Sequence, residues 1–217
     1  MSDFVLYGYF RSSAAFRARI ALNLKGIKAE LRFVHLLKDG GHQHTQEYKA
    51  LNPLELVPAL VHDGHTITQS MAIIEYLDEI VPEPPLLPKD AYGRARVREI
   101  SYAVGCDIHP VNNLRVNQYL KATFGADADA QIAWQRHWIE VGFGGLEKML
   151  SGSPHTGAWC HGDTPTMADV LLIPQCTNAR RVKLDLAAWP TIARIEGHAL
   201  AHPAFDAALP ANQPDAE

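Results

Sequence analysis

The sequence predicts an α/β N-terminal domain followed by an all-α C-terminal domain, and two observations support this fold class. Between residues 4 and 81, short apolar runs alternate with helical patterns. Such alternation is typical of a small sheet covered by helices. Beyond a proline-rich segment the strand signal ends, and long patterns of helical period take over.

The first domain, assigned to residues 1–82, is expected to have a β-α-β-α-β-β-α order. Phe16, Ile20 and Leu24 recur at helical spacing, and Gly26 is placed to end that helix. Asp63-Gly64 lies between two extended runs and predicts a hairpin. The expected elements are a strand at 4–9, a helix at 15–24, a strand at 30–35, a helical turn at 45–50, strands at 59–62 and 66–68, and a helix at 70–80.

A proline-rich linker is expected at 83–90, because residues 81–88 hold four prolines and cannot continue a helix. The all-helical domain is expected to fill residues 91–217. Pro110, with Asn112 and Asn113, is unfavourable inside a helix and predicts a kink there. The helical patterns cover 91–121, 129–150, 167–178, 191–201 and 203–208.

Composition restricts the class of protein. The chain has 217 residues and a formal charge of -4, which gives no support for nucleic-acid or anionic-membrane binding. A small or polar partner is favoured. Cys106, Cys160 and Cys176 have no metal-ligand or disulfide spacing and fit a reducing compartment. No signal pattern or membrane-spanning apolar run is found, so we expect a soluble, cytoplasmic protein.

The segment Arg11-Ser12-Ser13 joins the first strand to the first helix and has two interpretations. Unpaired N–H groups at a helix N-terminus favour a bound anion, and the two hydroxyls would add hydrogen bonds. Alternatively, Ser12 or Ser13 only caps the helix, since serine is a preferred N-cap residue.

Two other segments have similar alternatives. Pro58 biases Val57 towards an extended backbone, which would suit a ligand that adds as a strand, or Pro58 only marks a turn. Gln69-Ser70 precedes a helix and would hold a carboxylate, or Ser70 is a plain N-cap.

Three further patterns have mainly structural interpretations. Thr166 and Asp169 fit a capping box ahead of an apolar run. Arg180-Arg181 follows a helix end and is either a solvated pair or a carboxylate clamp. The histidines near Gln43 lie in a polar loop without a cysteine, so no metal site is expected.

The chain resembles the zeta-class glutathione transferases, whose best-known activity is maleylacetoacetate isomerase. Residues 9–22 resemble that family's serine-serine-cysteine signature. The resemblance implies a glutathione transferase fold: a thioredoxin-like domain that binds glutathione, a helical domain that shapes the second-substrate pocket, and a homodimer. Further matches lie at Ala50-Leu51-Asn52-Pro53, Val57-Pro58, Gln69-Ser70, Ala72 to Leu77, Ile108-His109-Pro110, Gly162-Asp163, Met167-Ala168-Asp169 and Gln213-Pro214-Asp215.

Carried over by position, the resemblance assigns roles to individual residues. Ser12 would face the glutathione sulfur with Ser13 beside it, and Gln69-Ser70 would hold the γ-glutamyl carboxylate. Arg11 and Arg181, with Arg115 as a third candidate, would bind the carboxylate and oxo groups of the substrate, and Gln43 and Val57 the rest of the tripeptide. The full set implied for glutathione is Ser12, Ser13, Ala14, Ala15, Phe16, Arg17, Gln43, Val57, Pro58, Gln69, Ser70, His109, Asn113, Leu114 and Arg115.

The chain departs from the family pattern at three positions. Ala14 stands where the signature has cysteine, His109 where many relatives have glutamine, and Phe16 where tryptophan is usual. Because Ala14 has no thiol, the resemblance implies that glutathione supplies the sulfur. It also implies a cis Val57-Pro58 bond.

The implied activity is glutathione-dependent cis–trans isomerisation of maleylacetoacetate to fumarylacetoacetate in tyrosine and phenylalanine catabolism. Three alternatives remain open at this point. They are maleylpyruvate isomerase of gentisate degradation, a general glutathione transferase or α-halo acid dehalogenase, and a non-catalytic binding module.

Overall fold

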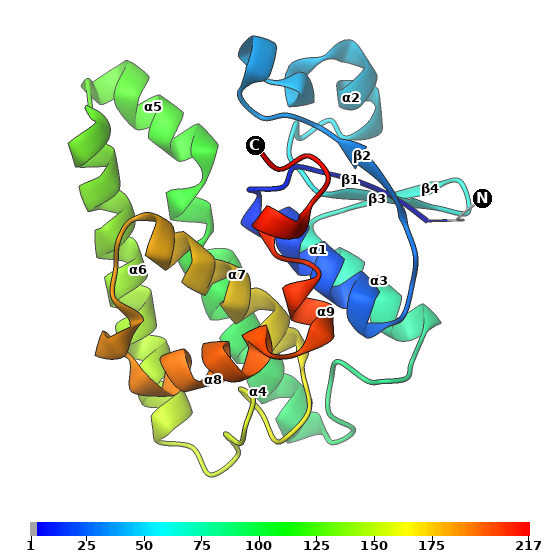
Figure 1. Ribbon diagram of the computed structural model, residues 1–217, viewed down its shortest axis with the longest axis vertical. Helices are drawn as coiled ribbons and strands as arrows, with labels where there is room; N and C mark the ends of the chain where they lie inside the picture. Colours follow the sequence, from blue (N-terminus) through cyan, green and yellow to red (C-terminus); the bar gives the residue numbers. More distant parts are fainter. Residues whose placement is uncertain (1–3) are drawn as a thin grey trace. The chain divides into compact units, whose positions relative to one another are not determined.

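The structure is a computed structural model that describes residues 4–217 (Figure 1). Residues 1–3, the start of the expected first domain, lie outside the described residues. The contacts divide the chain into two compact units. Unit 1 runs to Leu86 and includes Leu200–Glu217, and unit 2 is Leu87–Ala199.

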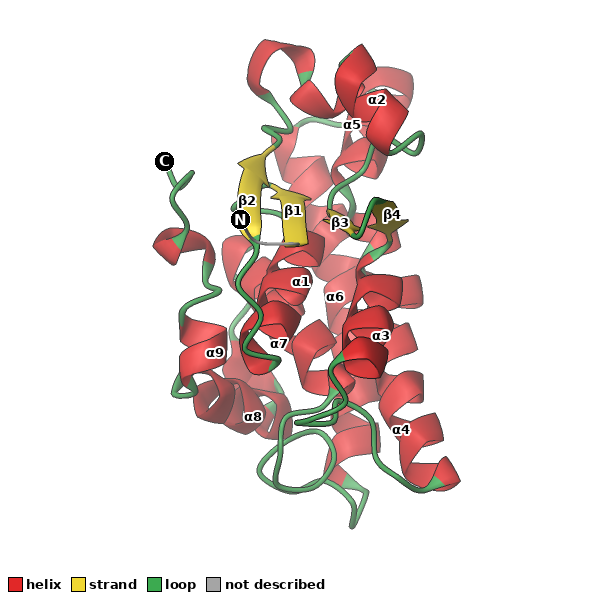
Figure 2. Ribbon diagram, turned by 90° about the vertical axis from the view of Figure 1, so that its right-hand side faces the viewer, coloured by secondary structure: helices red, strands yellow, loops and turns green. Residues whose placement is uncertain are grey.

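Unit 1 contains a four-stranded mixed sheet in the order β2-β1-β3-β4 (Figure 2). The parallel pair is β1 and β2, and the other neighbours are antiparallel. The expected α/β class is therefore confirmed. The strands are β1 Phe4–Gly8, β2 Glu30–Phe33, β3 Ala59–His62 and β4 His65–Thr68.

The hairpin between β3 and β4 lies where the sequence predicts it. His62 pairs with His65, and Asp63 and Gly64 have φ values of 48° and 76°. Two central residues with positive φ are typical of the tight turn that matches the twist of two antiparallel strands.

Helices cover both faces of this sheet. α1 (Ser13–Leu24) and α3 (Ser70–Ile80) lie on one face, and α2 (Gln46–Leu51) lies on the other (Figures 1 and 2). The expected stop at Gly26 is confirmed: it has φ 65°, and the next N–H, of Ile27, donates to Leu22 O. Two 3₁₀ turns, η1 (Lys38–Gly40) and η2 (His42–His44), precede α2.

The C-terminal segment packs with unit 1, so the expected helical domain of residues 91–217 extends too far. Asn23 on α1 donates from Nδ2 to Ala204 O at 2.9 Å, and Arg19 donates from Nε to Ala208 O at 3.1 Å. These long-range bonds hold α9 (Pro203–Asp206) and the residue Ala208 after it against α1, and the 3₁₀ turn η6 (Pro210–Asn212) follows.

Unit 2 is helical, and the helix expected at 91–121 is broken into several pieces. A π-helical segment, in which His109 N–H donates to Val104 O, leads into Pro110, which has no N–H to continue the pattern. The elements are α4 Ala91–Tyr102, η3 Ala103–Ile108, η4 Pro110–Asn112, α5 Leu114–Phe124, α6 Ala128–Ser151, α7 Met167–Arg181, η5 Leu186–Ala188 and α8 Pro190–Leu200.

The predicted capping box starts α7. The fully buried carboxylate of Asp169 accepts hydrogen bonds from the N–H and Oγ1 of Thr166, both at 2.8 Å. Its other oxygen accepts from the N–H of Cys160, also at 2.8 Å. The three bonds tie the helix start to the preceding loop and confirm the structural interpretation.

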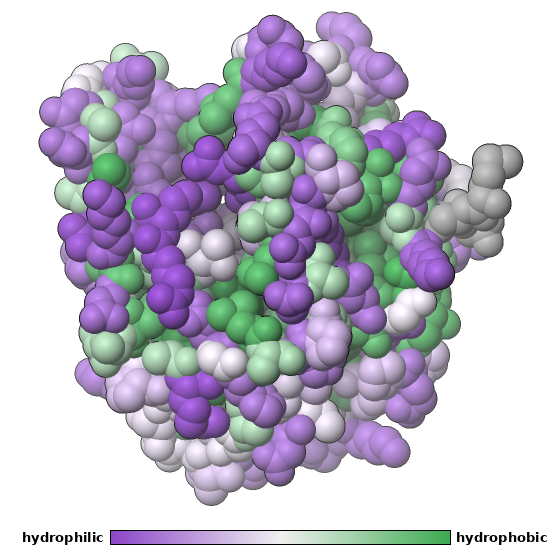
Figure 3. All heavy atoms as spheres, viewed as in Figure 1, coloured by the Kyte–Doolittle hydropathy of each residue, from purple (hydrophilic) through white to green (hydrophobic). Residues whose placement is uncertain are grey.

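On the face shown in Figure 3, hydrophilic and hydrophobic residues are interspersed. Within residues 4–217, no helix combines the length and the apolar character that crossing a bilayer requires.

Candidate active site

The connection from β1 to α1 places Ser12 at the helix N-cap. Its Oγ accepts a hydrogen bond from Ala15 N–H at 3.2 Å, so the capping interpretation is confirmed. Ser13 is the first helical residue and is 8% exposed. Capping does not exclude a chemical role, because a hydroxyl that accepts through one lone pair still has its proton to donate.

The N-termini of α1 and α3 are joined by a buried hydrogen bond. Arg17, which is 2% exposed, donates from Nη1 to Ser70 Oγ at 3.3 Å. Neither helix carries an acidic residue in its first turn. Two positive helix ends and a buried guanidinium thus favour a negatively charged ligand.

Ser70 is not the N-cap of α3, so the plain-cap interpretation of this serine is wrong. The N-cap is Gln69, whose side chain makes no capping bond and whose φ of 70° lies in the left-handed region. This conformation costs a non-glycine residue about 1–3 kcal/mol and is concentrated at functional sites. The Ser70 hydroxyl is used in the contact with Arg17 instead.

The Val57-Pro58 peptide bond is cis, which confirms the expected isomer. Among the described residues, neither the N–H nor the C=O of Val57 has a backbone partner. The preceding carbonyl, of Leu56, accepts from Tyr48 Oη at 2.7 Å and from Asn52 Nδ2 at 2.6 Å. Val57 therefore has both of its backbone groups available two residues before β3 begins, as strand addition requires.

Tyr48 and Asn52 hold the Leu56-Val57 segment through the Leu56 carbonyl. The sequence predicted no role for either side chain. Asn52 is 2% exposed and also accepts at Oδ1 from Leu54 N–H. Burial raises the pKa of Tyr48 to about 12, so its hydroxyl stays protonated and donates. Asn52-Pro53 is one of the motifs shared with the family, but the sequence does not indicate that the Asn52 side-chain amide binds the Leu56 carbonyl.

Gln43 lies in η2 and is 4% exposed. Its Nε2 donates to Leu36 O at 3.2 Å, while no described residue donates to its buried Oε1. A buried acceptor without a donor is costly in a folded protein. Gln43 thus fits a site whose ligand supplies an N–H group.

An ion pair connects the Gln43 and Val57 segments. His44 Nδ1 lies 2.5 Å from Glu55 Oε2, and Lys49 Nζ lies 3.4 Å from the other oxygen. The hydrogen bond from His44 is the main cause that lowers the pKa of Glu55; burial opposes it, and the nearby Lys49 charge lowers the pKa further.

Arg180 and Arg181, two neighbouring residues of unit 2, have different surroundings. Helix α7 extends to Arg181, further than the 167–178 expected, so both residues lie in its last turn. Arg180 forms a two-bond contact with Glu196 on α8, with Nε to Oε1 at 2.9 Å and Nη2 to Oε2 at 2.5 Å. Arg180 is therefore held in a structural contact, while Arg181, the next residue, is exposed.

The other candidates of unit 2 follow its broken helix. Asn113 is the N-cap of α5 and accepts at Oδ1 from Arg115 N–H at 3.3 Å. His109 and Leu114 are half-buried and Arg115 is exposed.

The remaining candidates belong to unit 1. Arg11 is exposed, and Ala14 is half-buried. Ala15 and Phe16 are buried in α1, and Pro58 is buried before β3.

The comparisons with known proteins agree with this geometry. Residues 2–79 match the glutathione S-transferase N-terminal domain. The probable maleylacetoacetate isomerase of Vibrio cholerae is 48% identical over 217 residues, which is 100% of both chains.

Two solved structures are also similar. One is the holo structure of a maleyl pyruvate isomerase, described as a bacterial zeta-class glutathione S-transferase, with a TM-score of 0.95 and 48% identity over 98% of this chain and 99% of that one. The other is a maleylacetoacetate isomerase from Methylobacterium extorquens AM1 with bound malonate and glutathione, with a TM-score of 0.94 and 41% identity over 98% and 99%.

Residues 2–79 thus match a glutathione transferase domain, and the similarity to the isomerases covers nearly the whole chain. This chain belongs to the zeta class of glutathione transferases, the family that includes the maleylacetoacetate and maleylpyruvate isomerases.

Proposed function

We propose that this protein is a glutathione-dependent cis–trans isomerase that converts maleylacetoacetate to fumarylacetoacetate. The observation that carries the proposal is Ser12 at the N-terminus of α1, with its hydroxyl proton available for donation. The Vibrio cholerae relative named for this activity matches the chain from end to end.

The residues present fit glutathione as the cofactor. The buried Gln43 Oε1 suits an N–H group, and Val57 offers both backbone groups. The N-terminus of α1 suits a thiolate, and that of α3 suits a carboxylate. When bound, glutathione supplies the thiolate that adds reversibly to the conjugated double bond, so that the bond can rotate before elimination.

The protein's part is to stabilise the thiolate and orient the substrate. A free thiol, with a pKa of about 8.5, is mostly protonated at neutral pH. Hydrogen-bond donation by Ser12 at a positive helix end favours the ionised form. Arg11 and Arg181, with Arg115 as a weaker third, provide guanidinium groups for the carboxylate and oxo groups of the substrate.

The signature position holds no cysteine, and two of the three cysteines of this chain are buried. Ala14 occupies the signature position, and all three cysteines lie in unit 2. Cys160 and Cys176 are fully buried, and burial raises the pKa of both thiols well above the ordinary value. Because the signature cysteine is absent, we assign the sulfur chemistry to the thiol of glutathione.

Maleylpyruvate isomerisation is the second candidate, and one observation favours it. The zeta-class maleyl pyruvate isomerase structure is as identical to this chain, at 48%, as the Vibrio cholerae relative is. The bond chemistry is the same on a shorter acid, so the two activities differ only in the substrate's length.

The deciding experiment offers maleylacetoacetate and maleylpyruvate to the purified protein, each with and without glutathione, and follows the loss of substrate and the appearance of the trans product. We expect turnover only with glutathione and a higher kcat/KM for maleylacetoacetate. A higher value for maleylpyruvate selects the second candidate, and no turnover of either substrate contradicts both.

The assembly and location are also part of the proposal. We propose a cytoplasmic homodimer, because that is what the family resemblance implies. The three cysteines are free, as a reducing compartment permits. Sedimentation equilibrium at several protein concentrations tests the dimer, and a monomer at all of them contradicts it.

A further inference from the structure

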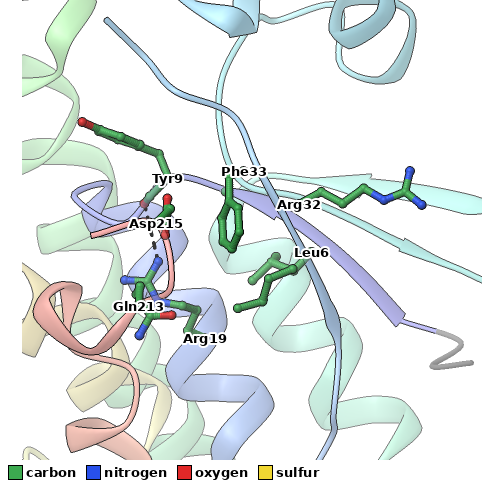
Figure 4. A pocket seen from close by; sticks show the side chains of 9 residues that line it. Leu6, Tyr9, Arg19, Arg32, Phe33, Gln213 and Asp215 are labelled. Atoms are coloured by element: carbon green, nitrogen blue, oxygen red, sulfur yellow. Dashed lines mark hydrogen bonds between the residues drawn. The ribbon is translucent and has the colours of Figure 1, made fainter. Parts of the chain in front are cut away.

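The backbone of Phe10 is held at both of its polar groups, two residues before Ser12. Its N–H donates to Asp215 Oδ2 at 3.0 Å, and its C=O accepts from Arg19 Nη2 at 3.1 Å. Figure 4 shows the Arg19 guanidinium and the Asp215 carboxylate directed at the chain near Tyr9, where β1 ends. A residue of α1 and a residue of the C-terminal segment therefore hold one short stretch of chain.

Arg19 donates hydrogen bonds to three backbone carbonyls. Besides Phe10 O, it donates to Ala208 O at 3.1 Å and to Tyr9 O at 3.5 Å. It is 7% exposed, and burial lowers its pKa to about 10, against the opposing effect of the Asp215 charge. Arg19 is thus charged at neutral pH, and Asp215 is the acidic group that compensates a guanidinium taken out of water.

The clamp formed by Arg19 and Asp215 is connected directly to Ser12. Tyr9 O, which accepts from Arg19, also accepts from Ser12 N–H at 3.0 Å. The clamp's acidic side is itself fixed, because Gln213 Nε2 donates to Ala207 O at 3.0 Å and to Leu209 O at 2.9 Å. Ser12 is therefore connected through the Tyr9-Phe10 backbone to Asp215, which is 205 positions from Phe10 in sequence.

We propose that Arg19 and Asp215 are positioning residues for Ser12, which they act on through the Tyr9-Phe10 backbone. This inference rests on the proposed function, in which the Ser12 hydroxyl donates to the glutathione thiolate. A hydrogen bond weakens steeply with distance and angle, so a small shift of the Phe10 backbone reduces the stabilisation of the thiolate. Neither residue is expected to touch glutathione or the substrate.

The first test measures the pKa of the glutathione thiol in the binary complex, from the ultraviolet absorbance of the thiolate. The variants are Asp215→Ala and the isosteric Asp215→Asn, with Asp206→Ala as the matched control on the same segment, where the side chain is exposed. We expect the bound thiol's pKa to rise by about one unit in Asp215→Ala, less in Asp215→Asn, and not at all in the control. An unchanged thiol pKa in Asp215→Ala contradicts the proposal.

A second readout needs no cofactor. Hydrogen exchange at the Phe10 and Ser12 amides should be faster in Asp215→Ala than in Asp206→Ala, with the amides of α3 unchanged. Faster exchange with no change in the thiol pKa means that the segment is merely structural, and overturns the proposal. Because Arg19→Gln removes a buried charge and is prone to misfold, the two Asp215 variants keep the inference testable.

A double-mutant cycle separates positioning from a direct effect. In a Ser12→Ala background, Asp215→Ala should raise the thiol pKa no further, because its effect passes through the missing hydroxyl. Additive effects of the two substitutions contradict the proposal. If the unmodified protein does not lower the thiol pKa of glutathione at all, the proposed function fails instead, and the exchange result alone then reports on the clamp.

Discussion

Arg17 on α1 donates a hydrogen bond from Nη1 to Oγ of Ser70, the first residue of α3, across 53 positions of sequence. The bond places two helix N-termini side by side, and each is free of acidic residues in its first turn. We propose that these two ends hold the sulfur and the γ-glutamyl carboxylate of glutathione.

Replacing Ser70 should therefore weaken glutathione binding. We expect Ser70→Ala to raise the dissociation constant about tenfold and to lower the free energy of unfolding by about 1 kcal/mol, the usual value of one hydrogen bond. Calorimetric titration and urea unfolding measure the two effects. Ser101→Ala is the matched control, since Ser101 is fully buried and donates to Val97 O at 2.7 Å; it should lose stability and keep its affinity.

Ser12 and Ser13 should differ sharply in their effect on the thiolate. Ser12→Ala is expected to move the pH at which kcat/KM is half-maximal upward by about one unit or more, because the bound thiol then ionises less readily. Ser13→Ala should leave that pH unchanged. A pH–rate profile for each variant decides between them, and the reverse order would assign the sulfur contact to Ser13.

The two arginines at the end of α7 should separate binding from stability. Arg181→Met is expected to raise KM for the diketo acid about tenfold, with KM for glutathione unchanged, because it removes a guanidinium from the substrate carboxylate. Arg180→Met should leave both KM values unchanged and lower the free energy of unfolding by about 1–2 kcal/mol, since it leaves the carboxylate of Glu196 buried without its partner. Equal changes of KM in the two variants would contradict these assignments.

Backbone recognition at Val57 is best tested from the ligand side, because no side-chain substitution removes the two backbone groups. Glutathione with an N-methylated cysteinyl amide should bind about tenfold more weakly than glutathione. The methyl ester of the glycyl carboxylate, which leaves that amide intact, is the control ligand. Equal affinity for glutathione and its N-methyl derivative would show that Val57 does not bind the cysteinyl part.

The pair of His44 and Glu55 predicts a pH-dependent contribution to stability. The pKa of Glu55 is lowered in the folded protein, chiefly by the hydrogen bond from His44, so the folded state favours the carboxylate. The stabilisation is present above the ordinary pKa of 4.5 and is lost as the pH falls through the lower folded value. Urea unfolding should show Glu55→Gln less stable than the unmodified protein at neutral pH, with the difference vanishing in acid. Glu79→Gln, at an exposed position of α3, should show no such trend.

Local signals predicted the elements of unit 1 well. The ranges 59–62 and 70–80 expected for a strand and a helix agree with β3 and α3. The turn at Asp63-Gly64 and the cap at Asp169 were also predicted, because their hydrogen bonds join residues only a few positions apart. The single helix expected at 91–121 is wrong because its interruption depends on distant residues. The sequence indicated a kink at Pro110, but the π-helical segment before it depends on packing within unit 2.

The sequence by itself determined the fold class, the two-part organisation and the family. Apolar periodicity, turn residues and motif order can all be recognised from the order of residues alone. Only the tertiary structure decided that Ser70 accepts a hydrogen bond from Arg17 and is not a cap. It also decided that Arg180 binds Glu196 and that residues 200–217 pack with unit 1. It also placed Arg19 and Asp215 on either side of Phe10. These contacts join residues that are distant in sequence, so their geometry is set by how the elements pack and leaves no periodic signal in the chain.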